Sequence, residues 1–345
     1  MVNNHIHIFT TDDIPNNFLP LGLVRWLAKK DRKVFNWILH NLNPFTDNDV
    51  LDRYLDFVRV GKLGGQKEIF ENIMKEYPKE TEFNVLTMDM SFMGAGKVPR
   101  NYELQLKELS ALKKQYPQIN AFCHIDVRRS NYLELFNNCI NVLGFNGVKL
   151  YPPLGVAPFD DRYSHIYEIC EKKNIPIMAH CTNGNPVHFK GSRKELVQLL
   201  CKYGFPIDLH KTNKELCSLF THPKNYERLL LKYPKLNFCL AHFGRGSEWD
   251  YVILEMIEKY DNLYVDCSYA MANENYWYKF KLQLITNEKL RSHCLFGSDY
   301  YMNVIENTEQ QWSCKLRVFL GEEIWKDLTI NNSNKYLYKN TKYMT

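Results

Sequence analysis

The chain has 345 residues, of which 45% are hydrophobic and 24% are charged, and its formal net charge is +5. This composition is ordinary for a soluble globular protein, and the length suits one large α/β barrel. Lysine and arginine are scattered without a basic block, which argues against a nucleic-acid partner. No apolar run approaches the roughly 18 residues of a membrane span, which argues against insertion into a bilayer.

Short apolar runs recur along the chain and predict eight parallel strands. In chain order they read HIHIF, NVLTMDM, INAFCHIDV, GVKLY, IPIMAHC, LNFCLAHF, LYVDCSY and CLFGSDY. Many are continuously apolar, as strands buried on both faces must be, and helical patterns lie between them. This alternation favours an α/β fold, a (β/α)8 TIM barrel forming one domain over residues 1–345. A doubly wound open sheet is less well supported, because no Gly-rich phosphate loop follows the first strand.

A long segment, residues 10–83, separates the first two predicted strands. Helical patterns lie within it at about residues 21–39, 50–60 and 66–77. Since an insertion after a barrel strand lies at the catalytic mouth, we expect a helical cap there. Further helices are predicted at about residues 102–116, 131–143, 162–173 and 249–260. Ser192 and Glu195 form a capping-box pattern at the start of another helix, and the tail from Glu306 onward also has a helical pattern.

Polar residues stand at the carboxyl ends of several predicted strands, where a parallel barrel carries its chemistry. His5 and His7 are two apart in the first strand, so both rings should point into the barrel, where two imidazoles can chelate one metal ion. The HxH pattern also arises by chance, and a solvated pair near the N-terminus is the ordinary alternative.

Lys149 ends the fourth predicted strand, where a buried ammonium is costly unless it is paired. Three interpretations compete. Lys149 can form a carbamate with CO2 that bridges two metal ions, remain an ammonium facing Asp299 or a substrate anion, or make a structural salt bridge in the barrel mouth.

His180 and His242 each follow an alanine at the end of an apolar run and precede a turn. One histidine in this setting is more often a hydrogen-bonded core residue, but two at the ends of consecutive strands indicate a joint role. Asp299, in the run FGSD, needs a cation or several donors, although capping a helix is its alternative role. Together the strand-end residues predict a site for one or two transition metal ions, made from His5, His7, Lys149, His180, His242 and Asp299.

This constellation, with its order and intervals, resembles the amidohydrolase superfamily, which consists of metal-dependent hydrolases built on a (β/α)8 barrel. The closer similarity is to the amidohydrolase-2 branch, which also contains decarboxylases similar to aminocarboxymuconate-semialdehyde decarboxylase. The runs GVKLYPPLG, MAHCTNG, LAHFGRG and FGSD look like that branch, and the resemblance extends from His5 to Asp299. It implies that His5, His7 and Asp299 bind a first ion, joined by His180 in a one-metal site.

The same resemblance leaves the number of metal ions open. In a two-metal site, His180 and His242 hold the second ion, bridged by a carboxylated Lys149. With one metal, His242 is instead an acid/base or polarising group. Zinc is the first choice of metal, and manganese, iron, cobalt and nickel suit the same ligands comparably well.

Two reactions follow from these expectations. Hydrolysis would act on a small amide, lactone or ester through metal-activated water, with Asp299 taking and returning the proton and His242 polarising the carbonyl. The alternative is a non-hydrolytic decarboxylation at the same metal, in which His242 or Asp299 protonates the carbon that loses CO2. A barrel that binds a ligand without turnover is the remaining class, which an intact ligand set disfavours.

Cationic and hydrogen-bond-donating residues near the predicted mouth favour an anionic small-molecule substrate. Those assigned to substrate binding are Arg245, Tyr151, Asn183 and Arg128. Each has an ordinary alternative, since Arg128 and Arg129, for example, can pair with Asp126 or Asp161 on the barrel rim. Residues 269–280 are rich in aromatic side chains and suit either a pocket lining or an interface in a homo-oligomer.

Ten cysteines occur without a CxxC pair, mostly inside apolar runs. We expect free, buried thiols rather than a disulfide framework, which suits a cytoplasmic protein. The first strand begins where a signal peptide would lie, with no basic and apolar leader before it, and this also favours the cytoplasm.

Overall fold

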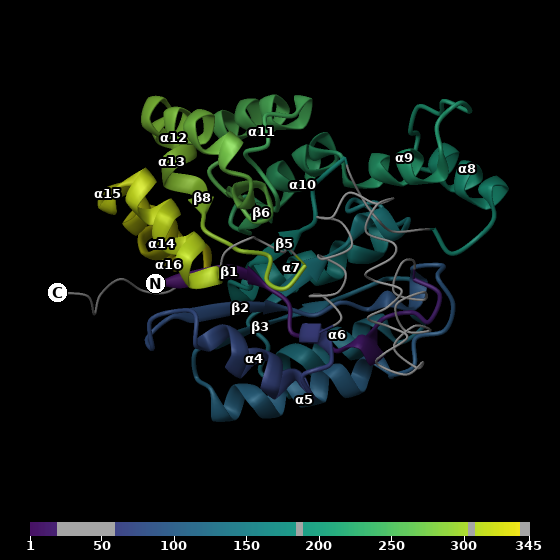
Figure 1. Ribbon diagram of the computed structural model, residues 1–345. Helices are drawn as coiled ribbons and strands as arrows, with labels where there is room; N and C mark the ends of the chain where they lie inside the picture. Colours follow the sequence, from purple (N-terminus) through teal and green to yellow (C-terminus); the bar gives the residue numbers. More distant parts are fainter. Residues whose placement is uncertain (19–58, 184–188, 303–307, 339–345) are drawn as a thin grey trace, which may run out of the picture.

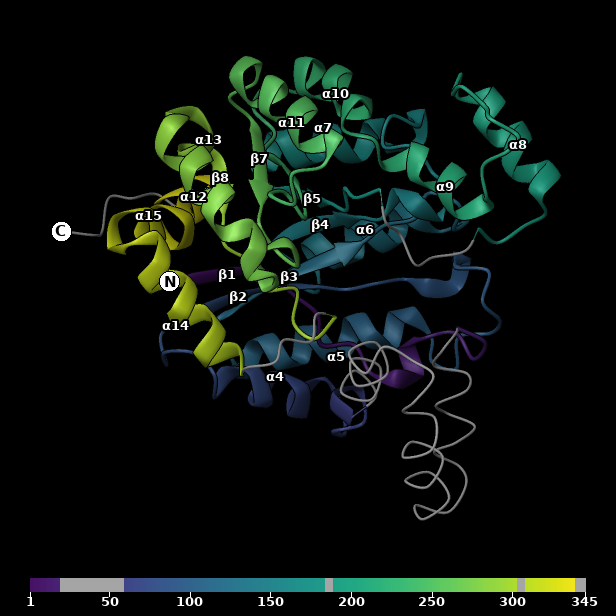
Figure 2. The same ribbon diagram turned by 45° about the horizontal axis from the view of Figure 1, so that its top comes forward.

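The computed structural model describes residues 1–18, 59–183, 189–302 and 308–338. Eight parallel strands form one sheet in which neighbours in space are neighbours in the chain (Figures 1 and 2). The strands are β1 (Val2–Ile6), β2 (Glu82–Leu86), β3 (Ile119–His124), β4 (Gly147–Leu150), β5 (Ile177–Ala179), β6 (Phe238–Leu240), β7 (Leu263–Asp266) and β8 (Cys294–Leu295).

The first and last strands meet, so the sheet curls into a nearly closed barrel. The amide of Asn4 donates to the Phe296 carbonyl at 2.8 Å, and the amide of Asp299 donates to the His5 carbonyl at 2.8 Å. A further bridge pairs Ile6 with Tyr300. The expected α/β barrel is therefore confirmed, and the residues after β8 lie directly beside the end of β1.

Helices surround the barrel, with α4 and α5 on one side and α11 to α13 on the opposite side (Figure 1). The α-helices in the described residues are α4 (Gln66–Met74), α5 (Tyr102–Gln115), α6 (Tyr132–Asn141), α7 (Ser164–Lys173), α8 (Arg193–Lys202), α9 (Asn213–Ser218), α10 (Glu227–Lys232), α11 (Glu248–Lys259), α12 (Trp277–Thr286), α13 (Glu288–His293), α14 (Glu309–Leu320), α15 (Glu322–Lys326) and α16 (Asn332–Tyr336).

The predicted helices are confirmed wherever the structure describes them. Ser192 is the N-cap of α8, and its amide donates to the Glu195 carboxylate at 2.5 Å, as the capping-box pattern requires. The last predicted pattern of the insertion after β1 corresponds to α4. The other two, at residues 21–39 and over most of 50–60, lie outside the described residues, and the cap stays a prediction.

β1 is displaced from the apolar run that predicted it, and the later strands are shorter than their runs. The run HIHIF begins at His5, whereas β1 covers Val2–Ile6 and leaves His7 beyond its end. The run CLFGSDY contains a strand of two residues, Cys294–Leu295. Apolar character reports burial rather than strand pairing, and the chain stays buried as it turns at the barrel mouth.

Side chains from the strands fill the barrel interior. Phe122, Met178 and Cys239 belong to one buried cluster with Tyr336 of α16, so the helical tail packs into the barrel. A Cβ at Gly147 would lie 2.2 Å from the Phe122 ring, so this glycine makes room for it. His180 follows Met178 by two positions, which places the strand-end residues one layer above this cluster.

All ten cysteines are free and eight of them are buried, which confirms their expected role as small core residues. Among the helices that the structure describes, none has the length and apolar character needed to cross a membrane.

Candidate metal centre

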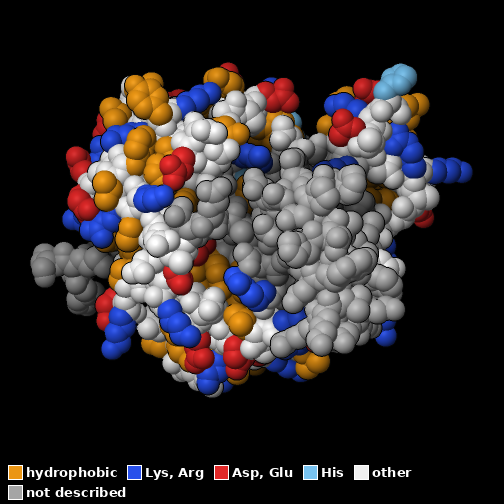
Figure 3. Space-filling model, viewed as in Figure 1, with side chains coloured by type: hydrophobic (Ala, Val, Ile, Leu, Met, Phe, Trp, Pro, Cys, Tyr) orange, Lys and Arg blue, Asp and Glu red, His pale blue; other side chains and the backbone are white. Residues whose placement is uncertain are grey.

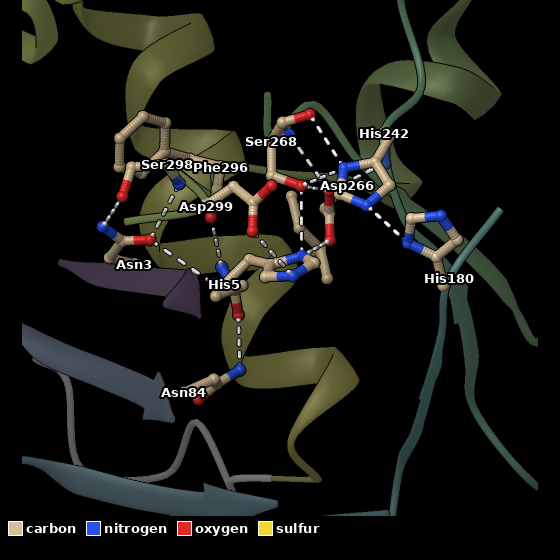
Figure 4. A network of polar contacts seen from close by, with 12 residues as sticks. Asn3, His5, Asn84, His180, His242, Asp266, Ser268, Phe296, Ser298 and Asp299 are labelled. Carbon is tan, nitrogen blue, oxygen red and sulfur yellow. Dashed lines mark hydrogen bonds and ion pairs between the residues drawn. The ribbon is translucent and has the colours of Figure 1, made fainter. Parts of the chain in front are cut away.

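His5 and His7 direct their rings toward one carboxylate at the barrel mouth. The register of β1 against β2 shifts between Asn3 and Ile6, and an irregularity of this kind re-aims the side chains that follow. Nε2 of His5 and Nε2 of His7 each lie 3.4 Å from Oδ1 of Asp299. Figure 4 shows the His5 ring and the Asp299 carboxylate facing each other. The structure therefore brings these three predicted residues together.

The atoms at the centre of this group lack partners. Nε2 of His5 and Oδ1 of Asp299 are buried and form no hydrogen bond among the described residues. One nitrogen from each of His5 and His7 and one oxygen of Asp299 lie within 4.8 Å of one another. Imidazole nitrogens and carboxylate oxygens are the ligands that zinc and neighbouring transition metals take in proteins. The donor set fits one divalent ion, which would satisfy the orphaned atoms.

Asp266, at the end of β7, fixes the proton of His5. Oδ2 of Asp266 lies 2.8 Å from Nδ1 of His5, while Oδ1 accepts the amides of His242 at 3.1 Å and Ser268 at 3.0 Å. Burial alone would raise the pKa of Asp266, but His5, His242 and Ser268 hold that pKa below its usual range. The ionised carboxylate accepts the Nδ1 proton of His5, which leaves the Nε2 lone pair for a metal ion.

The protonation of His5 agrees with this arrangement. Burial, followed by the nearby charge of Lys149, lowers the pKa of His5 to about 4, against the opposing charges of Asp266 and Asp299. His5 is therefore neutral at pH 7. A second group of ligand-type atoms contains His5, His242 and Asp266. Asp266 hydrogen-bonds with the Nδ1 of His5 and with the backbone amide of His242, so these hydrogen bonds explain why the three residues lie together.

His180 and His242 form a pair beside the three-residue group. Nε2 of His242 lies 3.0 Å from Nδ1 of His180, and Nδ1 of His242 lies 3.2 Å from the Ser268 carbonyl. The ring centroids of His5 and His242 are 5.2 Å apart. Of the expected one-metal set, His5, His7 and Asp299 form one group, and His180 lies beside it, paired with His242.

Lys149 points into the barrel, because it is in register with Met178 of the interior cluster. Its side chain is only 1% exposed, and the structure describes no residue that hydrogen-bonds or ion-pairs with its ammonium. Burial lowers the pKa of Lys149 to about 8, although Asp266 and Asp299 act in the opposite direction. Of the three interpretations, a direct structural salt bridge is not formed within the described residues.

Two arginines on the rim are engaged with carboxylates. Arg128 contacts Asp126 at 2.5 Å and donates to the Leu154 carbonyl at 2.8 Å, which is the rim pairing that the sequence allowed. Arg129 pairs with Asp89 instead of Asp126 or Asp161, because Asp89 caps the turn after β2 next to it. Both guanidinium groups are therefore held by the protein, and a substrate contact of Arg128 stays a prediction.

The other predicted substrate-binding residues lie on the loops after β4, β5 and β6. The Tyr151 ring is 4.5 Å from the His180 ring, centroid to centroid. Arg245 lies over the Tyr269 ring at 5.4 Å, and within the described ranges no carboxylate is in ion-pair distance of it. Asn183 is exposed at the end of a described segment.

Sequence reasoning missed Asp266 and Ser268, which both lie in the run LYVDCSY. The signal for Asp266 is present, since an aspartate inside a buried apolar run needs donors or a cation, as does Asp299. Ser268 carries no such signal, because a serine after a strand is common in turns.

The profile of the amidohydrolase family matches residues 109–340, about two thirds of the chain, and the chain belongs to this family. No curated protein matches it significantly in sequence. The solved structure of 4-oxalomesaconate hydratase from Rhodopseudomonas palustris is similar over 98% of this chain and 95% of its own, with a TM-score of 0.52 and 16% identity. A uronate isomerase from Bacillus halodurans C-125 is similar over 99% and 93%, with a TM-score of 0.51 and 13% identity. At these identities the two structures support the fold alone.

Proposed function

We propose that the protein is a metal-dependent hydrolase acting on a small amide, lactone or ester with an anionic end. The observation that carries this proposal is the meeting of His5, His7 and Asp299 around orphaned ligand atoms at the barrel mouth. Family membership makes the chain an amidohydrolase-superfamily enzyme. The fold by itself does not choose the reaction, because a hydratase and an isomerase share it.

His5, His7 and Asp299 would hold the ion, with zinc as the first choice. A bound ion of this kind would lower the pKa of a coordinated water toward neutrality and so would supply the nucleophile. Asp299 would hold the proton of the attacking water and return it to the leaving group. Burial raises the pKa of Asp299, but His5, His7 and His242 hold that pKa below its usual range, so the carboxylate is ionised at neutral pH.

His242 would polarise the carbonyl or exchange a proton with the substrate. Burial lowers the pKa of His242, so the ring is neutral at pH 7. The ring is held from both sides, by Ser268 at Nδ1 and by His180 at Nε2. To act on the substrate, Nε2 of His242 would exchange its contact with His180 for one with the substrate, while Ser268 keeps the ring in place at Nδ1.

Arg245 is the cationic residue that we assign to an anionic end of the substrate. Arg245 lies three residues after His242, and its charge is not paired with a carboxylate in the described parts of the chain. The Tyr151 hydroxyl stays protonated at neutral pH, since burial raises its pKa, and it can donate a hydrogen bond beside His180. Arg128 is the weaker candidate because Asp126 already neutralises it.

A second ion would require Lys149 as a carbamate, with His180 and His242 as further ligands. Only the neutral amine reacts with CO2, and a pKa of about 8 gives Lys149 a larger neutral fraction at pH 7 than an exposed lysine has. The metal content separates the two arrangements. Near two ions per chain selects the carbamate, and near one ion selects a site in which His242 is an acid/base group.

The mixed surface charge and the free thiols support proposals about the binding partner and the cellular location of the protein. Lysine, arginine and acidic side chains are interspersed over the described part of the face in Figure 3. We propose a small-molecule substrate rather than a nucleic acid or membrane, and a cytoplasmic location that keeps the ten thiols reduced.

The test is a metal analysis of protein purified without chelator, followed by assays with anionic amides, lactones, esters and carboxylic acids in ¹⁸O-labelled water. Hydrolysis predicts metal in the protein and labelled oxygen in the product. Release of CO2 without uptake of water would replace this proposal with decarboxylation. Stoichiometric metal combined with inertness toward the whole panel would favour a binding protein.

The double variant His5→Ala with His7→Ala tests the ligand assignment. We expect it to lose both metal and activity while keeping its far-UV circular dichroism, because two of the three ligands are removed at the barrel mouth. His165→Ala with His210→Ala removes two exposed histidines and is the matched control. Retained metal and turnover in the first variant would refute the assignment.

A further inference from the structure

Ser268 lies two residues after the end of β7, between His5 and His242. In the proposed reaction His5 is a metal ligand, whereas His242 is an acid/base or polarising group. Its side chain is fully buried. Oγ of Ser268 lies 3.0 Å from Nδ1 of His5 and 3.0 Å from Nδ1 of His242. The hydroxyl also donates to Oδ1 of Asp266. Figure 4 shows Ser268 at the meeting point of these side chains.

The backbone holds Ser268 in this place. Its amide donates to Oδ1 of Asp266 at 3.0 Å, and its carbonyl faces Nδ1 of His242 at 3.2 Å. Tyr269, the next residue, has a φ of 61°, in the left-handed region. A Cβ at Gly297 would lie 3.2 Å from the Ser268 Cβ, so the neighbouring chain leaves little room for another position.

Counting protons around Ser268 assigns the tautomers of both rings. Asp266 accepts from two amides and from Nδ1 of His5, so it takes part only as an acceptor. The single hydroxyl proton of Ser268 therefore goes to Asp266, and its lone pairs can only accept. An accepting Oγ requires a proton on Nδ1 of His5 and on Nδ1 of His242. Both Nε2 atoms are then left with lone pairs.

We propose that Ser268 is a positioning residue whose hydroxyl holds the rings of His5 and His242 in fixed orientations relative to each other, so that the metal ligand and the acid/base imidazole share one hydrogen-bonded chain. The inference rests on the metal site proposed above. Nε2 of His5 points at the ligand group, and Nε2 of His242 accepts the Nδ1 proton of His180. Ser268 thus couples the two sites without contacting metal or substrate.

The test compares Zn²⁺ affinity, measured by chelator competition, in the wild type, Ser268→Ala and Ser268→Cys. Loss of a group behind a metal ligand weakens metal binding by about 10- to 100-fold, and we expect both variants to fall in this range. Cysteine keeps the side-chain size but bonds weakly through its thiol, so it separates hydrogen bonding from shape. Ser333→Ala removes another fully buried hydroxyl, which accepts from Asn4 at 2.8 Å, and should leave the affinity unchanged.

A second measurement reads the tautomers directly. In ¹⁵N-histidine spectra of the metal-free protein, His5 and His242 of the wild type should both be protonated at Nδ1. Ser268→Ala should keep both rings protonated at Nδ1, because Oδ2 of Asp266 and the backbone carbonyl of residue 268 still accept there, but it should shift both Nδ1 resonances through loss of the shared hydroxyl. Its far-UV circular dichroism should stay native, and a merely structural role would not shift the two resonances together. Unchanged affinity and unchanged Nδ1 resonances of His5 and His242 in Ser268→Ala overturn the inference alone. A wild type that binds neither Zn²⁺ nor Co²⁺ overturns the proposed metal site as well.

Discussion

Two buried carboxyl groups show how the surroundings of a residue set its charge. Asp266 receives two backbone amides and an imidazole N–H, and its pKa is held below the usual range. Glu309, in the first turn of α14, accepts the Tyr77 hydroxyl at 2.6 Å. Burial raises the pKa of Glu309 to about 7, with Glu76 and Asp299 adding to the shift against the hydrogen bonds of Tyr77 and Ser298. Donors therefore decide which buried carboxyl stays ionised.

The raised pKa of Glu309 makes stability fall as the pH rises. The folded state binds this proton more tightly than the unfolded state, whose carboxyl has a pKa near 4.5. The contribution of Glu309 is most favourable below about pH 4.5 and is lost as the pH rises through about 7. Between pH 5 and pH 8 the wild type should lose roughly 2 kcal/mol of unfolding free energy that the Glu309→Gln variant does not lose.

Urea denaturation of both proteins at the two pH values measures this difference. The Gln oxygen can still accept from Tyr77, so the hydrogen bond is kept while the charge is removed. Glu255→Gln, in an exposed position on α11, is the control. A wild-type-minus-variant difference that is the same at both pH values would contradict the assignment.

Among the elements, the ends of β6, β7 and β8 share one backbone feature. His242, Tyr269 and Asp299 all adopt left-handed conformations, with φ of 72°, 61° and 60°. Non-glycine residues pay of order 1 kcal/mol for this conformation, and it concentrates at functional sites. Here the left-handed conformation occurs within the few residues that follow each strand, where the chain turns at the barrel mouth.

The close approach of β1 and the segment after β8 depends on Gly297. A Cβ at this position would lie 2.7 Å from the His5 Cβ and 3.2 Å from the Ser268 Cβ. We expect Gly297→Ala to destabilise the protein by about 1–3 kcal/mol, as overpacking does, and also to weaken Zn²⁺ binding, because His5 must move. Thermal denaturation and chelator competition measure the two effects.

Gly204→Ala is the matched control, since Gly204 has a φ of +73° but open space around it. The control should lose stability through backbone strain alone and keep its metal affinity. If Gly297→Ala and the wild type bind Zn²⁺ equally well, the close approach of β1 and the segment after β8 does not determine the geometry of the metal site.

At the scale of the whole molecule, the C-terminal tail completes the barrel core. Tyr336 of α16 packs with Phe122, Met178 and Cys239 inside the barrel. Its hydroxyl is buried and has no hydrogen-bond partner among the described residues. The ring contributes to stability through packing, whereas the unpaired hydroxyl carries a desolvation cost.

Two substitutions at Tyr336 separate these contributions. Tyr336→Ala should lower the unfolding free energy by about 3–5 kcal/mol, because it leaves a cavity in the barrel. Tyr336→Phe should be neutral or slightly stabilising, because it removes only the unpaired hydroxyl. Urea denaturation measures both, and a Phe variant as unstable as the Ala variant would show that the hydroxyl is bonded in solution. Neither variant should lose its metal, since the strand-end residues lie one layer away.

Much of the fold and part of the site could be predicted from individual residues. Apolar runs separated by helical patterns were sufficient to predict the barrel, because a strand that is buried on both faces has a continuously apolar sequence. His5, His7 and Asp299 could be proposed as a group, since each is a polar residue at the end of such a run. Asp266, a buried aspartate inside LYVDCSY, has the same pattern but is missed. The partners expected for Arg129 on the barrel rim, Asp126 and Asp161, are wrong, because the turn after β2 presents Asp89 to it.

The sequence by itself determined the order of the strands, the ends at which chemistry gathers and the kinds of ligand atoms present there. These follow from local periodicity and from the cost of burying polar groups, which act on each segment separately. Only the tertiary structure decided that His180 faces His242, that Asp266 stands behind His5 and that Ser268 joins the two. Those contacts depend on the closure of β8 onto β1 and on left-handed turns after the strands, and no segment by itself specifies its distance to a partner on another strand.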